Sequence, residues 1–260
     1  SEWEHVVDPW QLRSWEDYRD VVRLGRKTRL PEKQRRVLWD IYGKVLEGLK
    51  GDNLLTMSGV FDFLAGKLSK QKTHPFDFAV IDEAQDISVA QLRFLVAIGG
   101  KDPNALFFAG DQGQRIFRQP FSWKSVGADI RGRSRTLKVN YRTSHQIRKQ
   151  ADRLLEKTIT DIDGEIQDRS DTISVFNGVP PRIEYADDQD KETSLVASWI
   201  KERAEEGVLP HEIAVFVRSH GEIERAKKAV ALANLPFSVL DDSVQTSSGK
   251  ASIATMHLAK

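Results

Sequence analysis

The stretch Phe76-Asp-Phe-Ala-Val-Ile-Asp-Glu-Ala-Gln-Asp86 decides how the rest of the chain is interpreted. Residues 76–81 are apolar except for one aspartate, which is typical of a short strand buried on both faces of a parallel sheet. The run ends in two adjacent carboxylates, Asp82 and Glu83. Open α/β sheets bind their ligands at this carboxyl end of the strands. The stretch therefore predicts an α/β fold with an acidic site at one edge of the sheet.

An acid pair at a sheet edge suits phosphoryl transfer from a nucleotide. In that chemistry Asp82 holds Mg²⁺, directly or through water, and Glu83 orients and deprotonates the attacking water. The alternative is purely structural: Asp82 starts a turn, or it caps the helix that begins near Ile87. The acid pair alone leaves these two interpretations equally open.

Three later stretches narrow the choice. A second apolar run, Ala105-Leu-Phe-Phe-Ala109, leads into Gly110-Asp-Gln-Gly-Gln-Arg-Ile-Phe117. It is followed by Leu137-Lys-Val-Asn-Tyr-Arg-Thr143 and by Ile253-Ala-Thr-Met-His-Leu-Ala-Lys260. With the acid pair, these stretches resemble four consecutive motifs of the UvrD/Rep-type superfamily 1 DNA helicases: the Walker B acids, GDxxQxI(Y/F), NYR and the opening of TxHxAKG. One such motif is weak support, whereas four in the right order are specific.

The resemblance implies a RecA-like P-loop NTPase fold, in which helices flank parallel sheets. It implies a helical inserted subdomain over residues 1–72, the later half of a first RecA-like domain over 73–133, and the first part of a second over 134–260. The sequence contains no GxxxxGK[ST] loop to hold the phosphates of ATP. We expect this loop upstream of Ser1 in a longer parent protein, and expect the present residues alone to hydrolyse ATP very poorly.

The resemblance also implies roles for three residues near ATP. Gln114 contacts the γ-phosphate and the attacking water, since its amide both donates and accepts. Arg142 acts as an arginine finger from the second domain, and Tyr141 stacks on the nucleotide base. The alternatives are an ordinary turn residue for Gln114 and a core aromatic at a strand end for Tyr141. ATP and Mg²⁺ are the cofactors implied.

Further residues are expected to bind DNA. Phe117 matches a family aromatic that stacks on DNA, and Thr255 and His257 match a motif that contacts the DNA backbone and couples the two domains. After Phe117 the family usually continues with Arg-Gly, whereas this chain has Arg118-Gln-Pro-Phe-Ser-Trp123. Trp123 either takes over a stacking place or packs in the core. The basic residues expected to contact phosphates are Arg115, Arg118, Lys124, Arg131, Arg133 and Arg135.

The charge distribution favours an anionic partner. The net charge is only +1, but residues 112–150 carry ten Lys or Arg and a single acid, whereas residues 151–192 carry twelve acids and five bases. A basic segment beside an acidic one indicates a localised partner, such as single-stranded or partial duplex DNA. A solvated surface that happens to be basic is the alternative.

Composition excludes other classes of protein. The chain has no cysteine, so disulfides and thiolate metal sites are excluded, and its six histidines show no metal-ligand spacing. No apolar run approaches the roughly 18 residues that cross a membrane. We expect a cytoplasmic protein.

Periodicity predicts the remaining elements. Expected helices cover residues 10–24, 31–49, 58–68, 88–98, 144–157, 192–205 and 222–233, and expected strands cover 135–139, 182–185, 213–217 and 252–256. Residues 158–180 are expected to form a loop. Five apolar residues recur at helical spacing along one face of the second helix: Val37, Leu38, Ile41, Val45 and Leu49. Four tryptophans (Trp3, Trp10, Trp15 and Trp39) are expected to pack. The alternation of strands and helices indicates a parallel sheet.

We therefore predict part of an ATP-dependent DNA helicase or translocase, for which the family implies 3′ to 5′ movement on single-stranded DNA. DNA repair and DNA replication are both open as its pathway. Three alternatives remain. The first is a translocase that does not separate strands. The second is a non-enzymatic helicase-like module that binds nucleic acid or a partner. The intact set of candidate catalytic residues argues against it: Asp82, Glu83, Gln114 and Arg142. The third and weakest is a metal-dependent nuclease, because the carboxylates for two metals are not evident. Protein partners stay unidentified.

Overall fold

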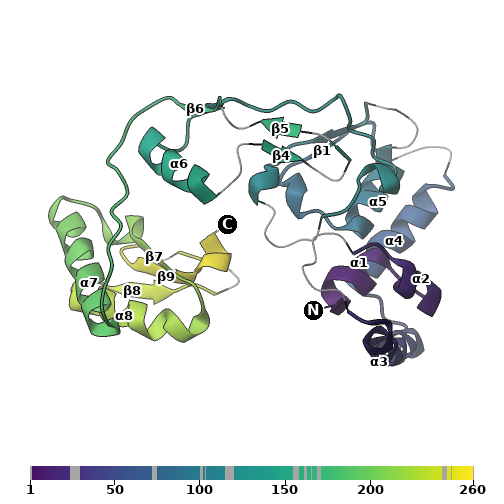
Figure 1. Cartoon of the computed structure of the whole chain (residues 1–260), viewed down its shortest axis with the longest axis horizontal. Helices are drawn as coiled ribbons and strands as arrows, with labels where there is room; N and C mark the ends of the chain where they lie inside the picture. The colour runs from purple at the N-terminus through teal and green to yellow at the C-terminus, as the bar shows by residue number, and fades with distance from the viewer. Residues whose placement is uncertain are drawn as a thin grey trace. The chain divides into compact units, whose positions relative to one another are not determined.

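A computed structural model of the chain describes residues 2–23, 30–71, 75–99, 102, 104–114, 120–154, 158–160, 163, 164, 166–168, 171–241, 245, 246 and 248–259. The chain forms two compact units, Ser1–Pro181 and Arg182–Lys260. Both contain helices and short strands (Figure 1).

The N-terminal helices of the first unit are α1 (Asp8–Trp10), α2 (Trp15–Asp20), α3 (Glu32–Gly51) and α4 (Met57–Leu68). One continuous helix over residues 10–24 was the wrong prediction. Gln11 has a left-handed φ of 53° and ends α1, and the Ser14 side chain then caps α2 by accepting from Asp17 N at 3.1 Å. α4 likewise begins at Met57, because its cap is Thr56, two residues before the predicted cap Ser58.

Aromatic side chains join these helices. Tyr18 is fully buried, and Trp15 is buried beside it, with Trp3, Trp10 and Trp39 packed around the same cluster. The prediction that the four tryptophans pack is confirmed. The apolar stripe predicted on α3 is only partly covered: Val37, Ile41 and Val45 are 57%, 53% and 43% exposed, whereas Leu38 and Leu49 are half-buried. α3 contacts the aromatic cluster through Trp39 and Tyr42 instead.

The sheet that carries the acid pair is smaller and more open than predicted. β1 (Ala79–Ile81) and β2 (Leu106–Phe108) pair in parallel, with Val80 opposite Phe107. α5 (Val89–Gly99) contacts both strands and covers one face. On the other face Val80 and Phe107 are 76% and 63% exposed, so the prediction of strands buried on both faces is wrong within the described residues. α5 begins where predicted, since Ser88 and Gln91 cap it reciprocally.

The rest of the first unit contains strands that the sequence analysis missed. β3 (Val139–Asn140) is shorter than predicted and pairs in parallel with β6 (Ile173–Ser174). The expected loop over 158–180 instead holds β6 and an antiparallel pair, β4 (Thr158–Thr160) and β5 (Ile166–Asp168). α6 (His145–Ala151) starts at the predicted Ser144 cap and continues as a 3-10 turn, Asp152–Leu154. Residues 155–157 of the predicted helix lie outside the described residues.

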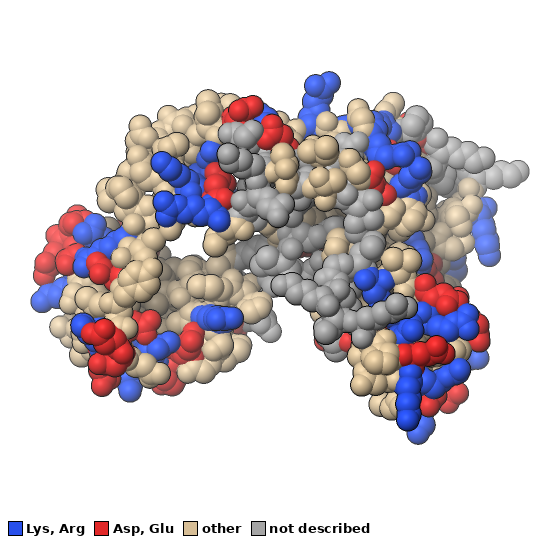
Figure 2. Space-filling view, viewed as in Figure 1, with Lys and Arg blue, Asp and Glu red and all other residues tan. Residues whose placement is uncertain are grey.

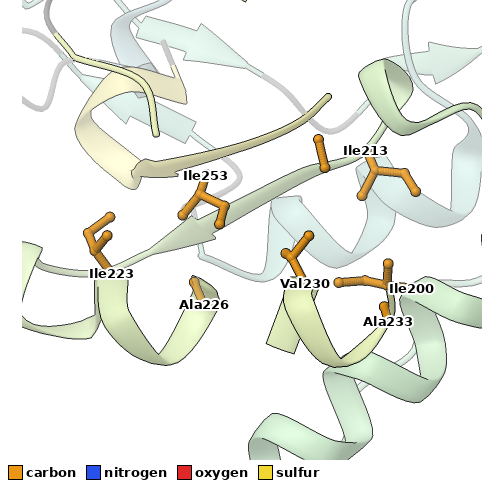
Figure 3. Close-up of a cluster of buried hydrophobic side chains, with 8 residues drawn as sticks. Ile200, Ile213, Ile223, Ala226, Val230, Ala233 and Ile253 are labelled. Atoms are coloured by element: carbon orange, nitrogen blue, oxygen red, sulfur yellow. The ribbon is translucent and has the colours of Figure 1, made fainter. Parts of the chain in front are cut away.

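The second unit is a three-stranded parallel sheet with two helices. Its elements are α7 (Gln189–Glu205), β7 (Ala214–Val217), α8 (Ile223–Leu232), β8 (Phe237–Val239) and β9 (Ala251–Thr255), and the strand order is β7-β9-β8. All five β9 residues are buried. Ile253 packs against Ile223 and Val230 of α8 and Ile200 of α7 (Figure 3). The predicted parallel sheet is confirmed here, but β8 was not predicted and residues 182–185 form no strand.

The surface carries both signs of charge. Lys and Arg side chains alternate with Asp and Glu over α3 and over α7 on the face drawn in Figure 2. Across the described part of the chain, no helix combines the length and the apolar character that crossing a membrane requires.

Candidate functional site

Backbone hydrogen bonds between the segments that follow β1 and β2 bring two of the predicted motifs together. Ala109 N donates to Ile81 O, and Ala84 N donates to Ala109 O, both at 2.8 Å. Hydrogen bonding between the two segments therefore continues past the strand ends. It holds the residues that follow β1, Asp82 and Glu83, against the Gly110 that follows β2. This is the carboxyl edge at which a parallel sheet binds ligands.

The acid pair forms a tight turn at that edge. Asp82 Oδ1 accepts a hydrogen bond from Glu83 N at 2.8 Å. Glu83 has a left-handed backbone, with φ 50° and ψ 40°, which is uncommon outside glycine and costs about 1–3 kcal/mol. Both side chains are exposed. Asp82 thus stabilises a turn, as the structural alternative suggested, but α5 is capped by Ser88 and Gln91 instead. The turn leaves both carboxylates at the surface.

The Gly110–Gln114 segment forms a second turn beside the first. Asp111 organises it: Oδ1 accepts from Gly113 N at 2.9 Å, and Oδ2 accepts from Gln114 Nε2 at 3.1 Å. Gln114 lies in the 3-10 turn Gln112–Gln114 and its side chain is exposed. The sequence analysis assigned no role to Asp111. Its place directly after the glycine of the motif was the available signal.

Hydrogen bonds of the Asn140 side chain hold the NYR motif, residues 140–142, in a turn. Asn140 Oδ1 accepts from Arg142 N at 2.8 Å and from Thr143 N at 3.1 Å, and Asn140 Nδ2 donates to Thr143 Oγ1 at 2.9 Å. Such an Asx turn fixes the backbone without a regular element. It presents Arg142 and Tyr141 to solvent, and Tyr141 is 74% exposed. A core position for Tyr141 is therefore wrong, and stacking on a nucleotide base stays a prediction.

Trp123 lies in the core of the first unit. Its side chain is 8% exposed and packs edge-on against Phe108, at a ring-centroid distance of 4.8 Å, and parallel to Phe121. The structure therefore agrees with the packing alternative, and the indole has little surface left on which a DNA base could stack.

The other predicted DNA contacts are distributed differently. Phe117 and Arg118 lie outside the described residues. Thr255 is the last residue of β9 and is only 5% exposed, whereas His257 is exposed in the following 3-10 turn, Met256–Ala259. Their contact with DNA stays a prediction.

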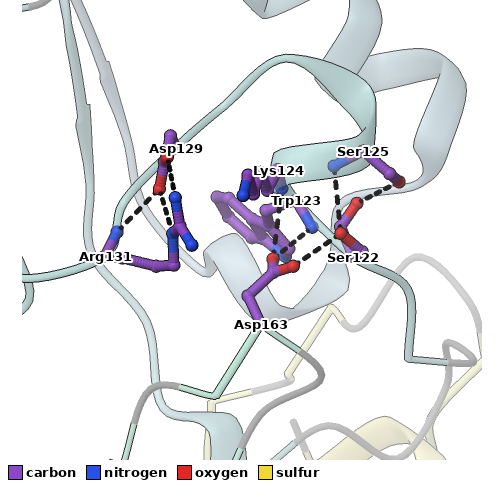
Figure 4. Close-up of polar contacts among 7 residues, drawn as sticks. All are labelled: Ser122, Trp123, Lys124, Ser125, Asp129, Arg131 and Asp163. Carbon is purple, nitrogen blue, oxygen red and sulfur yellow. Dashed lines mark hydrogen bonds and ion pairs between the residues drawn. The ribbon is translucent and has the colours of Figure 1, made fainter.

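A carboxylate from a distant part of the chain holds the segment around Trp123. Asp163, between β4 and β5, accepts from Ser122 Oγ at 2.5 Å, from Trp123 N at 2.7 Å and from Lys124 N at 3.1 Å (Figure 4). Burial raises the pKa of Asp163, but these hydrogen bonds outweigh it, and the pKa lies below the ordinary carboxyl value. No sequence pattern indicated this contact.

One of the basic residues predicted to contact phosphate already has an acidic partner. Arg131 forms a two-point contact with Asp129, at 2.8 and 2.6 Å (Figure 4). The Arg131 guanidinium lowers the pKa of Asp129 to about 2, chiefly through these side-chain hydrogen bonds. Both side chains are exposed, so the pair is screened by solvent and contributes little to stability.

The acid pair suits a magnesium ion that arrives with a nucleotide. Mg²⁺ is usually held by one or two carboxylates together with phosphate oxygens and water, and Asp82 is an exposed carboxylate at a strand end. Within the described ranges, no group of three or more His, Asp or Glu side chains is arranged to hold a metal by itself. The donor set fits a metal shared with phosphates.

Parallel strands flanked by helices, with carboxylate and amide side chains at the strand ends, define an α/β domain of the nucleotide-handling class. The UvrD/REP helicase N-terminal domain model matches residues 52–130, and the UvrD-like helicase C-terminal domain model matches residues 135–246. The chain belongs to the UvrD/Rep helicase family. This membership implies a RecA-like α/β fold, with which the small parallel sheets agree.

A curated relative supports the assignment. The chain is 27% identical over 184 residues to a Bacillus subtilis (strain 168) protein named "Putative ATP-dependent DNA helicase YjcD". The aligned residues make up 69% of this chain and 23% of that protein. The chain therefore spans about a quarter of the relative's length.

Proposed function

We propose that the protein carrying these residues is an ATP-dependent DNA helicase or translocase that moves 3′ to 5′ on single-stranded DNA. One observation carries the proposal: Asp82 and Glu83 lie at the carboxyl end of β1, bonded through the backbone to the motif that contains Gln114. In a chain of this family, that arrangement supports hydrolysis of ATP.

The two carboxylates of the acid pair have different roles in the proposed reaction. Glu83 orients a water molecule against the γ-phosphate and accepts the proton that this water loses on attack. Asp82 would hold Mg²⁺, which would supply positive charge to the phosphates. Gln114 contacts the same phosphate and water, since its amide can donate to one and accept from the other. The exposure of these side chains leaves them accessible to a nucleotide.

The NYR turn supplies the complementary groups. Arg142 stabilises the negative charge that develops on the transferring phosphoryl group, and Tyr141 stacks on the nucleotide base. The Asn140 turn supports both roles, because it fixes the backbone of Arg142 and leaves Tyr141 exposed. Closure of two RecA-like domains on ATP, and reopening after hydrolysis, would then drive movement along DNA.

The proposal that DNA is the partner rests on membership of the helicase family and on the positive charge of the basic segment, residues 112–150. Lys124, Arg133 and Arg135 are exposed within the basic segment, where they are available to phosphates. Phe117 is the candidate for stacking a base, with His257 and Thr255 contacting the backbone of single-stranded or partial duplex DNA.

The test is Glu83→Gln in the full-length protein. The amide cannot accept the proton, so turnover should fall by about 10²-fold or more while binding of ATP is retained. Glu205→Gln, an exposed glutamate on α7, is the matched control and should hydrolyse ATP at the wild-type rate. Robust turnover by Glu83→Gln would overturn the assignment of the base and favour a module that only binds nucleic acid or a partner.

A further inference from the structure

Gln85 is a buried polar residue beside the acid pair that the proposed chemistry does not use. It lies in the 3-10 turn Ala84–Asp86 and is only 4% exposed. Buried side-chain amides are usually held by specific partners, because an unsatisfied one is costly. The partners of Gln85 therefore indicate what the residue is for.

The amide of Gln85 bridges the two strand-end turns. Its Oε1 accepts a hydrogen bond from Asp111 N at 3.0 Å, and its Nε2 donates to Glu83 Oε2. The orientation follows from chemistry, since a backbone N–H can only donate and a carboxylate oxygen only accepts. Gln85 thus holds the candidate base on one side and the backbone of the GDxxQ motif on the other.

Gly110 makes room for this bridge. A Cβ at Gly110 would overlap Gln85 Oε1 and come within 3.0 Å of Ala84 N. Gly110 has no positive φ, so its backbone conformation does not itself require glycine. Glycine is needed here because the Gln85 amide and the backbone N–H groups of Ala84 and Gln85 all approach this position closely.

The bridge continues to the second catalytic candidate. The backbone N–H of Asp111 donates to Gln85, and the carboxylate of Asp111 accepts a hydrogen bond from Gln114 Nε2. One chain of hydrogen bonds therefore runs from Glu83 through Gln85 and Asp111 to Gln114. A chain of this kind makes the orientation of Glu83 depend on that of Gln114.

We propose that Gln85 is a positioning residue, which orients the Glu83 carboxylate for attack on ATP and couples it to Gln114 through Asp111. The proposal rests on the proposed function of the same site. The positioning role predicts that losing the Gln85 amide lowers the rate of the chemical step far more than the affinity for ATP. The reason is that Gln85 contacts the carboxylate of Glu83, the candidate general base, and is not assigned a contact with ATP.

The experiment measures DNA-stimulated ATP hydrolysis by the full-length protein with Gln85→Met, which keeps the volume and removes both hydrogen bonds. We expect kcat to fall about tenfold or more while KM for ATP stays within about threefold. Gln91→Met is the matched control: its amide caps α5 at Ser88, so this variant loses a backbone contact of similar kind outside the bridge. It should keep kcat within about twofold.

A second variant guards against a simple folding defect. Gly110→Ala leaves Gln85 in the chain but fills the space of its amide, and should lower kcat similarly. Part of the Gly110→Ala effect acts through the bridge and part through the backbone of Ala84 and Gln85, so the loss of kcat in the double variant should be smaller than the product of the two single losses. Melting temperature and ATP binding, measured for each, report the folded fraction.

The outcomes are distinct. A wild-type protein without hydrolysis would refute the proposed function itself. If the wild type hydrolyses ATP, then an unchanged kcat in folded Gln85→Met, a loss confined to KM, or additive effects of Gln85→Met and Gly110→Ala would each overturn the positioning role while leaving the proposed function intact.

Discussion

Removing the Asp163 carboxylate should loosen the segment that seats Trp123. Asp163→Ala deletes the acceptor of three hydrogen bonds, two of them from the backbone N–H groups of Trp123 and Lys124 at the start of the 3-10 turn Lys124–Val126. Losing a side-chain cap of this kind costs about 0.5–2 kcal/mol. Asp163 is only partly buried, so water replaces some of the loss, and we take about 1–2 kcal/mol for local opening.

The assay is amide hydrogen exchange in the full-length protein. A cost of about 1–2 kcal/mol corresponds to roughly 5- to 30-fold faster exchange at the amides of Trp123 and Lys124. Exchange in β9, which belongs to the other compact unit, should not change. Asp171→Ala, an exposed aspartate, is the matched control. Equal exchange of these two amides in wild type and Asp163→Ala would show that the carboxylate does not hold the turn.

Low pH should remove the difference in amide exchange between the wild type and Asp163→Ala. The pKa of Asp163 in the folded protein lies below the ordinary value of 3.8, so the carboxylate stabilises the turn fully above that value. The stabilisation is lost as the pH falls through the lower, folded-state pKa. Exchange rates of wild type and Asp163→Ala, corrected for the intrinsic pH dependence, should therefore converge in that range. A difference that persists when the carboxyl is fully protonated would contradict this cause.

Three other changes have defined outcomes. Ile253→Ala, at a fully buried position in the central strand of its sheet, should lower the free energy of unfolding by about 2–5 kcal/mol in denaturant titrations; under 1 kcal/mol would place it outside the core. Tyr141→Ala should raise KM for ATP several-fold in steady-state assays, whereas Tyr141→Phe should not, and equal behaviour of the two would remove the stacking role. Phe117→Ala should weaken single-strand affinity by about 1–3 kcal/mol in fluorescence anisotropy, and unchanged affinity would indicate a core residue.

The sequence predicted where the two motifs meet better than it predicted the burial of the sheet. The acid pair and the GDQGQ stretch could be placed together, because both follow apolar runs and the ends of neighbouring parallel strands share an edge. The runs around Val80 and Ile253 look alike in sequence, yet Val80 is 76% exposed and Ile253 is fully buried. Apolar content reports that a strand can be buried, and the elements packed against it decide whether it is.

The missed features depend on contacts between distant segments. β4 and β5 are three residues each, too short for an alternation pattern to stand out, and their pairing brings Asp163 to the turn at Trp123, 40 residues earlier. Gln85 and Asn140 were inside recognised motifs, but side-chain amides leave no periodic signal. Their roles became visible only from the hydrogen bonds of the folded chain.

The most direct test of the central claim is the ATPase rate of the full-length protein with and without single-stranded DNA. We expect hydrolysis that single-stranded DNA stimulates strongly and that Glu83→Gln lowers by about 10²-fold or more in both conditions. Hydrolysis that is indifferent to DNA would contradict a DNA-driven motor and move the substrate to RNA or a protein. No hydrolysis by a well-folded protein would contradict the enzyme itself.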